Sequence, residues 1–218
     1  MQAMILAAGL GTRLGKLTAD RPKALVEIKG KTLLEITAQK LIAAGCTHLI
    51  INVHHFADQI VSFVERHHGF GVKTDISVED TLLDTGGGIR YASRYFEDAP
   101  LLIHNVDIVT NLELTDFYSA GKAWQADALL AVRQRNSNRY FSFDASMQLQ
   151  GWESVQPAIR KGAVDQGDGR RFGFLGIHLI SPALMDHYFD QDAYSVVDWY
   201  LHLAASGRRI VGYENDDA

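Results

Sequence analysis

The sequence contains the segment Leu6-Ala7-Ala8-Gly9-Leu10-Gly11-Thr12-Arg13-Leu14, which is followed by Pro22-Lys23-Ala24-Leu25. The apolar run from Met4 to Ala8 predicts a first strand that is buried on both faces. A loop that leaves the carboxyl end of such a strand lies where open α/β sheets bind ligands. Its glycines let the backbone approach a phosphate closely, while Arg13 offers a forked set of donors and Lys23 a mobile point charge. The segment therefore predicts a phosphate-binding loop.

Other interpretations of these glycines fit the sequence less well. A dinucleotide-binding fingerprint needs Gly-x-Gly-x-x-Gly, but Gly9, Gly11 and Gly15 leave three residues in the last gap. A Walker A loop needs Gly-Lys-Ser/Thr after its spacer, and this sequence has none there. An ordinary glycine turn with two solvated cations would explain a lone Gly-x-Gly. It does not explain the full string with Arg13 and the later Pro22-Lys23.

The rest of the chain alternates apolar runs of strand length with segments of helical period, which is typical of a mostly parallel sheet flanked by helices. We predict strands at 4–8, 49–53, 72–78, 101–103, 128–132 and 209–213. We predict helices at 31–45, 58–67, 85–95, 114–124, 182–189 and 196–205. Alternating segments at 140–143, 149–152 and 172–179 predict added antiparallel strands. The fold class is therefore α/β, with one domain over 1–218 divided into a nucleotide-binding half (about 1–133) and a substrate-facing half (about 134–218).

Composition excludes several classes of protein. With 218 residues and 47% hydrophobic content the chain can bury one substantial core. A formal charge of −5 argues against a general nucleic-acid binder. Cys46 is the only cysteine, so no intrachain disulfide and no thiolate zinc cluster can form. Met1 leads directly into a short apolar run without a basic segment, so we expect no signal peptide, no membrane partner and a cytoplasmic protein.

The Gly-x-Gly-Thr-Arg segment and the later Pro-Lys resemble the signature of sugar-1-phosphate nucleotidyltransferases, most closely the bacterial uridylyl- and guanylyltransferases acting on muramic-acid-, mannose- or heptose-type 1-phosphates. The resemblance covers most of the chain and implies a GT-A-like, Rossmann-related fold. It implies a nucleoside triphosphate and a sugar 1-phosphate as partners and Mg²⁺ as cofactor. In such an enzyme the phosphates would contact Gly11, Thr12 and Arg13, and Lys23 would bridge the α-phosphate and the sugar phosphate. The base and ribose would contact the backbone of Ala7, Ala8 and Gly9.

A second cluster comprises Glu79, Asp80 and the run Thr85-Gly86-Gly87-Gly88-Ile89. Glycines that open a helix remove side chains where a ligand can approach, and free N–H groups at a helix start favour anionic or polar ligand atoms. The resemblance places Thr85, Gly86 and Gly87 against the nucleotide, with Glu79 nearby. A flexible turn, with Glu79 as a surface carboxylate, explains the same residues equally well from the sequence alone.

The third cluster is Leu101-Leu102-Ile103-His104-Asn105-Val106-Asp107. Asp107 follows a buried strand at the carboxyl edge of the sheet, and Mg²⁺ prefers one or two carboxylates with waters and phosphate oxygens. Asp107 is therefore the predicted metal ligand and, with Arg13 and Lys23, the third catalytic residue. The family commonly has Asn-Gly-Asp here, so Val106 departs from its pattern. His104 is expected to fill space, because an anionic sugar phosphate needs no general base.

The resemblance also implies a sugar site in the second half. Phe172-Gly173-Phe174-Leu175-Gly176-Ile177 is similar to a family strand whose glycines lie beside the sugar, and Glu153 would bind hydroxyl groups. A second metal-binding aspartate is expected after Glu214-Asn215-Asp216-Asp217-Ala218, with Asp216 and Asp217 in the loop that leads to it. Two alternatives remain open: a catalytically impaired nucleotide-sugar-binding or regulatory domain, and cytidylyl transfer to a polyol or alkyl phosphate. The nucleobase, the sugar and the oligomeric state are not determined by the sequence.

Overall fold

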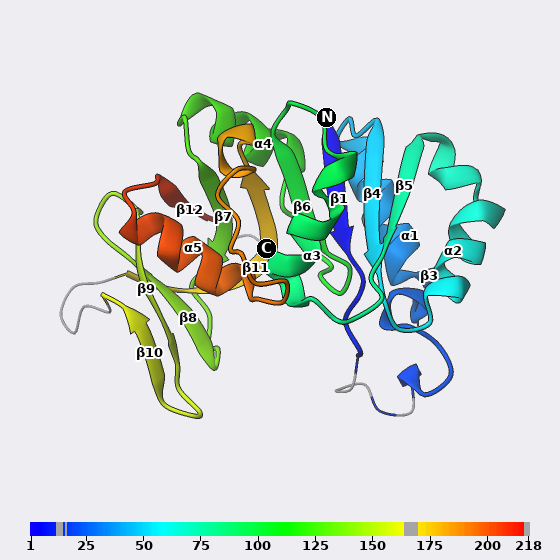
Figure 1. The fold of residues 1–218 in the computed structure, drawn as a ribbon, viewed down its shortest axis with the longest axis horizontal. Coiled ribbons are helices and arrows are strands. Elements are labelled where there is room, and N and C mark those ends of the chain that lie inside the picture. The colour runs from blue at the N-terminus through cyan, green and yellow to red at the C-terminus, as the bar shows by residue number, and fades with distance from the viewer. Residues whose placement is uncertain (12–14, 16, 164–169, 216–218) are drawn as a thin grey trace.

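The computed structural model describes residues 1–11, 15, 17–163 and 170–215 (Figure 1). The strands are β1 (Gln2–Leu6), β2 (Glu27–Ile28), β3 (Lys31–Thr32), β4 (His48–Val53), β5 (Lys73–Val78), β6 (Leu101–Asn105), β7 (Ala128–Arg133), β8 (Arg139–Phe143), β9 (Leu149–Ser154), β10 (Ile159–Gly162), β11 (Arg170–Ile180) and β12 (Ile210–Glu214). The α-helices are α1 (Leu33–Ala43), α2 (Ala57–Arg66), α3 (Asp84–Ala92), α4 (Leu114–Ala123) and α5 (Val196–Ala205). Short 3₁₀ turns are η2 (Lys23–Leu25), η3 (His68–Gly71), η4 (Ser93–Tyr95) and η5 (Pro182–Leu184).

The main sheet has the order β10-β9-β8-β11-β6-β1-β4-β5, and β7 pairs with both β11 and β12. Strand β1 lies between β4 and β6 and is parallel to both, and β5 is parallel to β4. Every residue of β1 and β4 is buried, as expected for strands covered on both faces. The parallel core expected from the sequence is therefore confirmed, and the carboxyl ends of β1, β4 and β6 meet at one edge.

Strand β11 joins this core to the antiparallel part of the sheet. Its end pairs with β6, while its start pairs with β8, which continues to β9 and β10. The pairing with β7 shifts register between Phe174 and His178, and Gly176 within that interval has a φ of +71°. A glycine adopts such an angle without strain, which lets the long strand change partners at this point. Figure 1 shows β8, β9 and β10 extending away from the parallel strands.

Helices cover the two faces of the sheet in separate groups (Figure 1). One buried cluster contains residues of α1, α2 and α4, and a second contains residues of α3 and α5. Helix α1 begins where Thr32 Oγ1 accepts a hydrogen bond from the amide of Glu35, a local cap that the sequence Thr-x-x-Glu favours. Gly45, two residues beyond the end of α1, has a φ of +92°, consistent with a glycine terminator.

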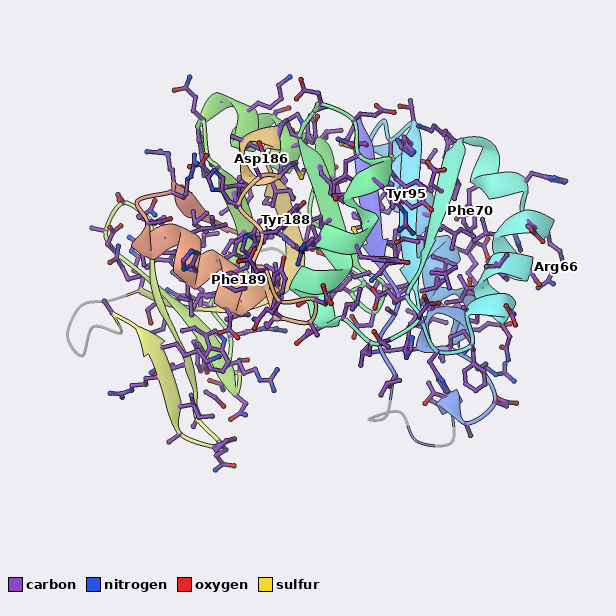
Figure 2. The ribbon with its side chains drawn as sticks, in the orientation of Figure 1. Arg66, Phe70, Tyr95, Asp186, Tyr188 and Phe189 are labelled. Atoms are coloured by element: carbon purple, nitrogen blue, oxygen red, sulfur yellow. The ribbon has the colours of Figure 1, made fainter. Side chains whose placement is uncertain are left out.

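One predicted helix is wrong. The segment expected to be helical at 182–189 forms only the short turn η5, and the chain then runs irregularly to α5. A tertiary contact holds the chain in this irregular path, since Arg90 Nη1 donates to the carbonyl oxygens of Phe189, Asp190 and Gln191 at 2.8–3.2 Å. Tyr188, labelled with Phe189 in Figure 2, stacks on Trp199 of α5 at 5.2 Å between ring centroids.

No helix in the described part of the chain is long and apolar enough to cross a membrane.

Candidate active site

A cleft of about 760 Å³ lies at the carboxyl edge of β1, β4 and β6. It is where an open α/β sheet is expected to bind a ligand. Both halves of the chain contribute to its wall. The described residues that line it are Leu6, Ala7, Ala8, Gly9, Leu10, Gly11, Lys23, Asn52, Leu82, Asp84, Thr85, Asn105, Val106, Asp107 and Arg139.

The predicted phosphate loop forms one wall of this cleft. The Ala7 amide donates to the side-chain oxygen of Asn52 at 2.9 Å, which anchors the loop where it leaves β1. A Cβ atom added at Gly9 would meet nothing within 4 Å, so the backbone there is open to the cleft. Gly11 has a φ of +68° and packs against Thr18 and Lys23, which fixes the turn. The loop therefore has the open, anchored backbone that close approach to a phosphate requires.

Lys23 and Asp107 meet in the cleft, although 84 residues separate them in sequence. Lys23 Nζ forms an ion pair with Asp107 Oδ2, and the two side chains are 19% and 27% exposed. Lys23 opens η2 directly after Pro22, whose extended backbone precedes the turn. The predicted lysine and the predicted acid are thus brought into one site by the fold.

Val106 does not disturb the end of β6. Its side chain is 5% exposed and belongs to the hydrophobic core, and its amide donates to the Leu6 carbonyl at 3.1 Å. Val106 is not among the residues with positive φ, so a glycine is not needed here. The next residue, Asp107, consequently reaches the cleft in spite of the departure from Asn-Gly-Asp.

Burial of His104 next to this site lowers its pKa to about 4. Its Nδ1 lies 2.8 Å from the carbonyl oxygen of Asn105, and its side chain is fully buried. A neutral, enclosed imidazole agrees with the expectation that His104 fills space.

Glu79 does not line the cleft but lies behind it. Its side chain is 3% exposed, and its carboxylate accepts hydrogen bonds from Asn52 Nδ2 at 2.7 Å and from the Leu83 amide at 3.2 Å. Burial raises the pKa of Glu79. Because Asn52 also binds Ala7, the carboxylate supports the phosphate loop through one intermediate residue. The interpretation of Glu79 as a surface carboxylate is wrong.

The expectation of free amides at the start of α3 is also wrong. The amides of Gly86 and Gly87 donate to the carbonyl oxygen of Tyr194, at 2.9 and 3.2 Å. An added Cβ would overlap the Tyr194 ring at Gly86 and the Asp192 carbonyl at Gly87. The protein's own segment therefore occupies the place predicted for a ligand. Of the four residues 85–88, only Thr85 lines the cleft.

The predicted sugar residues lie outside the wall of the cleft. Glu153 is 7% exposed and forms ion pairs with Arg160, at 3.5 Å, and with Arg171. A Cβ at Gly173 would lie 2.7 Å from Arg135 Nε, and one at Gly176 would lie 2.6 Å from the side-chain nitrogen of Asn105. Gly176 makes room for Asn105, which does line the cleft.

Sequence reasoning missed other residues that the fold places here. Arg139, Asn52, Leu82 and Asp84 line the cleft without belonging to any of the motifs described above. Asp84 has a φ of +58°, an angle that non-glycine residues rarely adopt outside functional or constrained sites. Thr12, Arg13, Asp216 and Asp217 lie outside the described residues.

An open α/β sheet with an anchored glycine loop, a lysine and a carboxylate at its carboxyl edge defines a protein of the nucleotide-handling α/β class. The model of the nucleotidyl transferase family matches residues 2–143, about two thirds of the chain. The chain belongs to that family, and it is a nucleotidyltransferase.

Comparison with curated relatives agrees with this assignment. The N-acetylmuramate alpha-1-phosphate uridylyltransferase of Caulobacter vibrioides is 31% identical over 213 residues, which cover 94% of this chain and 85% of the relative. The mannose-1-phosphate guanyltransferase of Gibberella zeae is 31% identical over 135 residues, covering 61% of this chain and 37% of the relative.

Among solved structures, HddC from Yersinia pseudotuberculosis in complex with GMP-PN has a TM-score of 0.76 at 22% identity, covering 98% of this chain and 90% of HddC. At that identity the likeness shows the fold alone. The GT-A-like fold implied by the resemblance is confirmed.

Proposed function

We propose that this protein transfers a nucleotidyl group from a nucleoside triphosphate to a sugar 1-phosphate, forming an NDP-sugar and pyrophosphate in a Mg²⁺-dependent reaction. The observation that carries the proposal is the contact of Lys23 with Asp107 beside the open backbone of Gly9. A cation and an acid next to a phosphate-type loop are the groups that nucleotidyl transfer requires, because its catalysis rests on positioning and charge stabilisation.

The nucleotide would occupy the side of the cleft formed by the first half of the chain. The base and ribose would lie on the backbone of Ala7, Ala8 and Gly9, with Thr85 at the α3 side. Leu10 and Leu82 line the same cleft and are 44% and 43% exposed, so they offer the apolar surface that a base can cover. The triphosphate would follow the loop through Gly11 to Thr12 and Arg13.

The donors present fit a Mg²⁺ ion that arrives with the triphosphate. The described residues hold no group of three or more His, Cys, Asp or Glu side chains that could bind a metal on its own. Asp107 supplies one carboxylate at the cleft, and one or two carboxylates with phosphate oxygens and waters suffice for Mg²⁺. When bound, the ion would neutralise phosphate charge. Asp107 would hold it, and Lys23 would exchange Asp107 for the α-phosphate and the sugar phosphate.

The reaction needs no general base. A phosphate oxygen of the sugar 1-phosphate forms a bond to the α-phosphorus, the bond to the bridging oxygen of the β-phosphate breaks, and that oxygen leaves with pyrophosphate. The attacking oxygen is already anionic, so no proton has to be removed. Lys23 and Arg13 would stabilise the charge on the transferring and departing phosphates. The neutral, buried His104 takes no part.

A matrix of substrates tests the proposal. Release of pyrophosphate would be measured for UTP, GTP, CTP and dTTP, each with N-acetylmuramate 1-phosphate, N-acetylglucosamine 1-phosphate and mannose 1-phosphate, with Mg²⁺ and again with EDTA. We expect turnover with at least one pair and none with EDTA. Binding of a triphosphate by calorimetry without turnover for any pair would contradict the proposal and favour the nucleotide-binding domain without activity.

A further inference from the structure

A second cavity, of about 500 Å³, lies along α3 and the turn η4. The described residues that line it are Asp80, Thr81, Leu83, Gly87, Arg90, Tyr91, Arg94 and Asp192. Within the described part of the chain, it shares no lining residue with the cleft of the candidate active site. The residues that α3 and η4 contribute recur at helical spacing, so they lie on one face of the helix. A cavity of this size is large enough for a small molecule, and neither proposed substrate is assigned to it.

Two arginines of the second cavity are held in place by the protein itself. Arg90 Nη1 donates to the three carbonyl oxygens of residues 189–191, at 2.8–3.2 Å. The guanidinium of Arg94 lies 4.2 Å from the centroid of the Tyr91 ring and 5.0 Å from that of Tyr95, which Figure 2 labels. Side chains four positions apart on a helix are neighbours. Two guanidinium groups fixed at that spacing are suited to bind the oxygens of one phosphate through charge-assisted hydrogen bonds.

The second cavity is lined by one cation and one anion that no other charge neutralises. Arg90 has a carboxylate oxygen of Asp192 at 3.7 Å. Arg94 and Asp80 form no ion pair with any side chain of the described residues, and therefore none with each other. Opposite charges that line one cavity without pairing are complementary to a ligand that carries both signs.

The segment 80–87 contributes to the walls of both cavities. Three of its residues, Leu82, Asp84 and Thr85, line the cleft, whereas four others line the second cavity. Leu83, one of these four, donates its amide hydrogen to Glu79 at 3.2 Å, and Glu79 is linked through Asn52 to the loop after β1. A ligand that fixes this segment from the second cavity therefore also fixes residues that line the cleft.

We infer that the second cavity is a regulatory site for a small zwitterion that carries a phosphate and an ammonium group and has the size of an amino sugar phosphate. Arg90 and Arg94 bind the phosphate, Asp80 binds the ammonium group, and Thr81 binds a hydroxyl group. The bound ligand holds the segment 80–87 against α3 and raises the affinity of the cleft for a nucleoside triphosphate. The inference goes beyond the proposed function, because this ligand is neither of the two substrates.

Two probes that differ in one amine test the binding site. Glucosamine 6-phosphate carries a phosphate and an ammonium group, and glucose 6-phosphate has a hydroxyl group in place of the amine. Calorimetric titration of the wild-type protein should give a Kd about fivefold lower for glucosamine 6-phosphate, because only its ammonium group is attracted as a charge by Asp80. Arg94→Gln should raise the Kd of both probes by roughly 10-fold or more, as loss of a charge-assisted contact does. Asp80→Asn should abolish the difference between the probes.

The regulatory effect is measured as the Kd of a triphosphate, without a sugar 1-phosphate present. The triphosphate used is the one of UTP, GTP, CTP and dTTP that binds the wild-type protein most tightly. Saturating glucosamine 6-phosphate should lower its Kd about threefold or more, and by linkage the triphosphate should lower the Kd of the probe by the same factor. In Arg94→Gln the same concentration of probe should leave the Kd of the triphosphate unchanged.

Matched variants control for charge and fold. Arg66→Gln removes an exposed charge at the end of α2, which packs in a different buried cluster from α3 (Figure 2), and should leave the Kd of both probes unchanged. Without a probe, Arg94→Gln should bind the triphosphate as the wild-type protein does, because Arg94 does not line the cleft. Thermal denaturation verifies that each variant folds.

The outcomes separate this inference from the proposed function. Absence of binding, or binding that Arg94→Gln leaves unchanged, would overturn the site, since probes that ignore Arg94 bind elsewhere. Equal Kd values for the two probes in the wild-type protein would overturn the assignment of a zwitterion. A triphosphate Kd that the probe leaves unchanged or raises would overturn the regulatory role. None of these measurements depends on turnover, so a failure of nucleotidyl transfer would reject the proposed function alone.

Discussion

The chain has two glycine-rich segments, and the structure uses them in opposite ways. Gly9 in the loop after β1 faces the cleft, and an added Cβ there would meet nothing within 4 Å. In α3, an added Cβ at Gly86 or Gly87 would overlap the segment 192–194, and one at Gly88 would lie 2.7 Å from both Asn52 and Glu79. The first, the open segment, leaves the wall of the cleft free, whereas the second, the filled segment, admits another part of the same chain.

The comparison shows that a glycine-rich segment predicts a close approach to its backbone. It does not predict whether a ligand or another part of the same chain makes that approach. Both segments are short, and both lie near the same edge of the sheet. The difference arises because the chain returns to α3 about a hundred residues later, where Tyr194 accepts the amide hydrogens of Gly86 and Gly87. Nothing among the described residues returns to Gly9 in this way.

Asn52 and Glu79 connect the two segments. Asn52 accepts a hydrogen bond from Ala7 in the loop and donates to Glu79, which accepts from Leu83 at the start of α3. The four residues form a continuous hydrogen-bonded path from the open segment to the filled one. The filled segment thus supports the position of the open one, although it does not itself touch the cleft at Gly86 or Gly87.

The largest effect is expected in the cleft beside the open segment, from Lys23→Ala. Loss of a cation that stabilises charge on the transferring phosphate should lower turnover by about 100-fold or more. The melting temperature should change little, because Lys23 lies at the cleft and outside the hydrophobic clusters. Pyrophosphate release and thermal denaturation measure the two effects. Turnover near the wild-type rate would reject the phosphate-side assignment.

A similar loss of turnover is expected at Asp107, the carboxylate that pairs with Lys23 in the cleft. Asp107→Asn should lower turnover by a similar factor and raise the Mg²⁺ concentration needed for half-maximal rate, because a neutral amide binds the ion more weakly. Titration of the rate with Mg²⁺ gives the result, with circular dichroism as the control for folding. Full activity at low Mg²⁺ would show that Asp107 does not hold the metal.

On the filled side, Gly87→Ala should destabilise the protein by about 2–3 kcal/mol, because the new methyl group overlaps a backbone carbonyl that cannot rotate away. The matched variant is Gly9→Ala, whose methyl group enters open space and should change the free energy of unfolding by less than about 0.5 kcal/mol. Urea denaturation of both variants decides the point. Equal destabilisation by the two variants would contradict the distinction between an open and a filled glycine segment.

Gly9→Ala should have its effect on binding instead. A methyl group on the cleft wall keeps the nucleotide from the backbone, so the KM for the triphosphate should rise about fivefold, roughly 1 kcal/mol. The KM for the sugar 1-phosphate serves as the internal control and should not change. An unchanged KM for every triphosphate would place the nucleotide elsewhere in the cleft.

The smallest effect concerns the path between the segments. Burial raises the pKa of Glu79, so between its ordinary value of 4.5 and the raised value the folded state binds more protons than the unfolded state. This residue therefore makes the free energy of unfolding fall as the pH rises through that window. Glu79→Gln should remove this contribution, so its stability should decline less than that of the wild type over the same window. Parallel pH dependences would contradict the burial of a titrating carboxylate.

Parts of the fold were predictable because their signals are local. The apolar run before Gly9 predicts β1, and the helical period that ends at Gly45 predicts α1, since each pattern acts over a few residues. The helix expected at 182–189 forms only as the turn η5, and Arg90 from α3 binds the carbonyl groups of Phe189, Asp190 and Gln191 at and just beyond its end. Such a contact does not change the hydrophobic period of the segment, so the segment's own sequence does not predict it.

The residues of the candidate site also fall into two groups, those that a local motif predicts and those that only the folded chain brings there. Lys23 and Asp107 were predictable, since each follows a recognisable pattern at the carboxyl edge of a parallel sheet, where such ends meet. Arg139 was not, because it reaches the cleft only through the pairing of β8 with β11, which no local motif encodes. Glu153 was assigned to the sugar, yet it forms ion pairs with Arg160 of β10 and Arg171 of β11.

The sequence by itself determined the α/β class, the glycine-rich loop after β1 and the family, because strand and helix periods and the Gly-x-Gly-Thr-Arg signature are contiguous in the chain. Only the tertiary structure decided which glycines stay open, that Glu79 supports the loop from behind, and which arginine faces the cleft. These features depend on contacts between residues that are 27 to more than 100 positions apart. Packing selects such contacts from many that the local sequence allows equally, so they become visible only when the chain is folded.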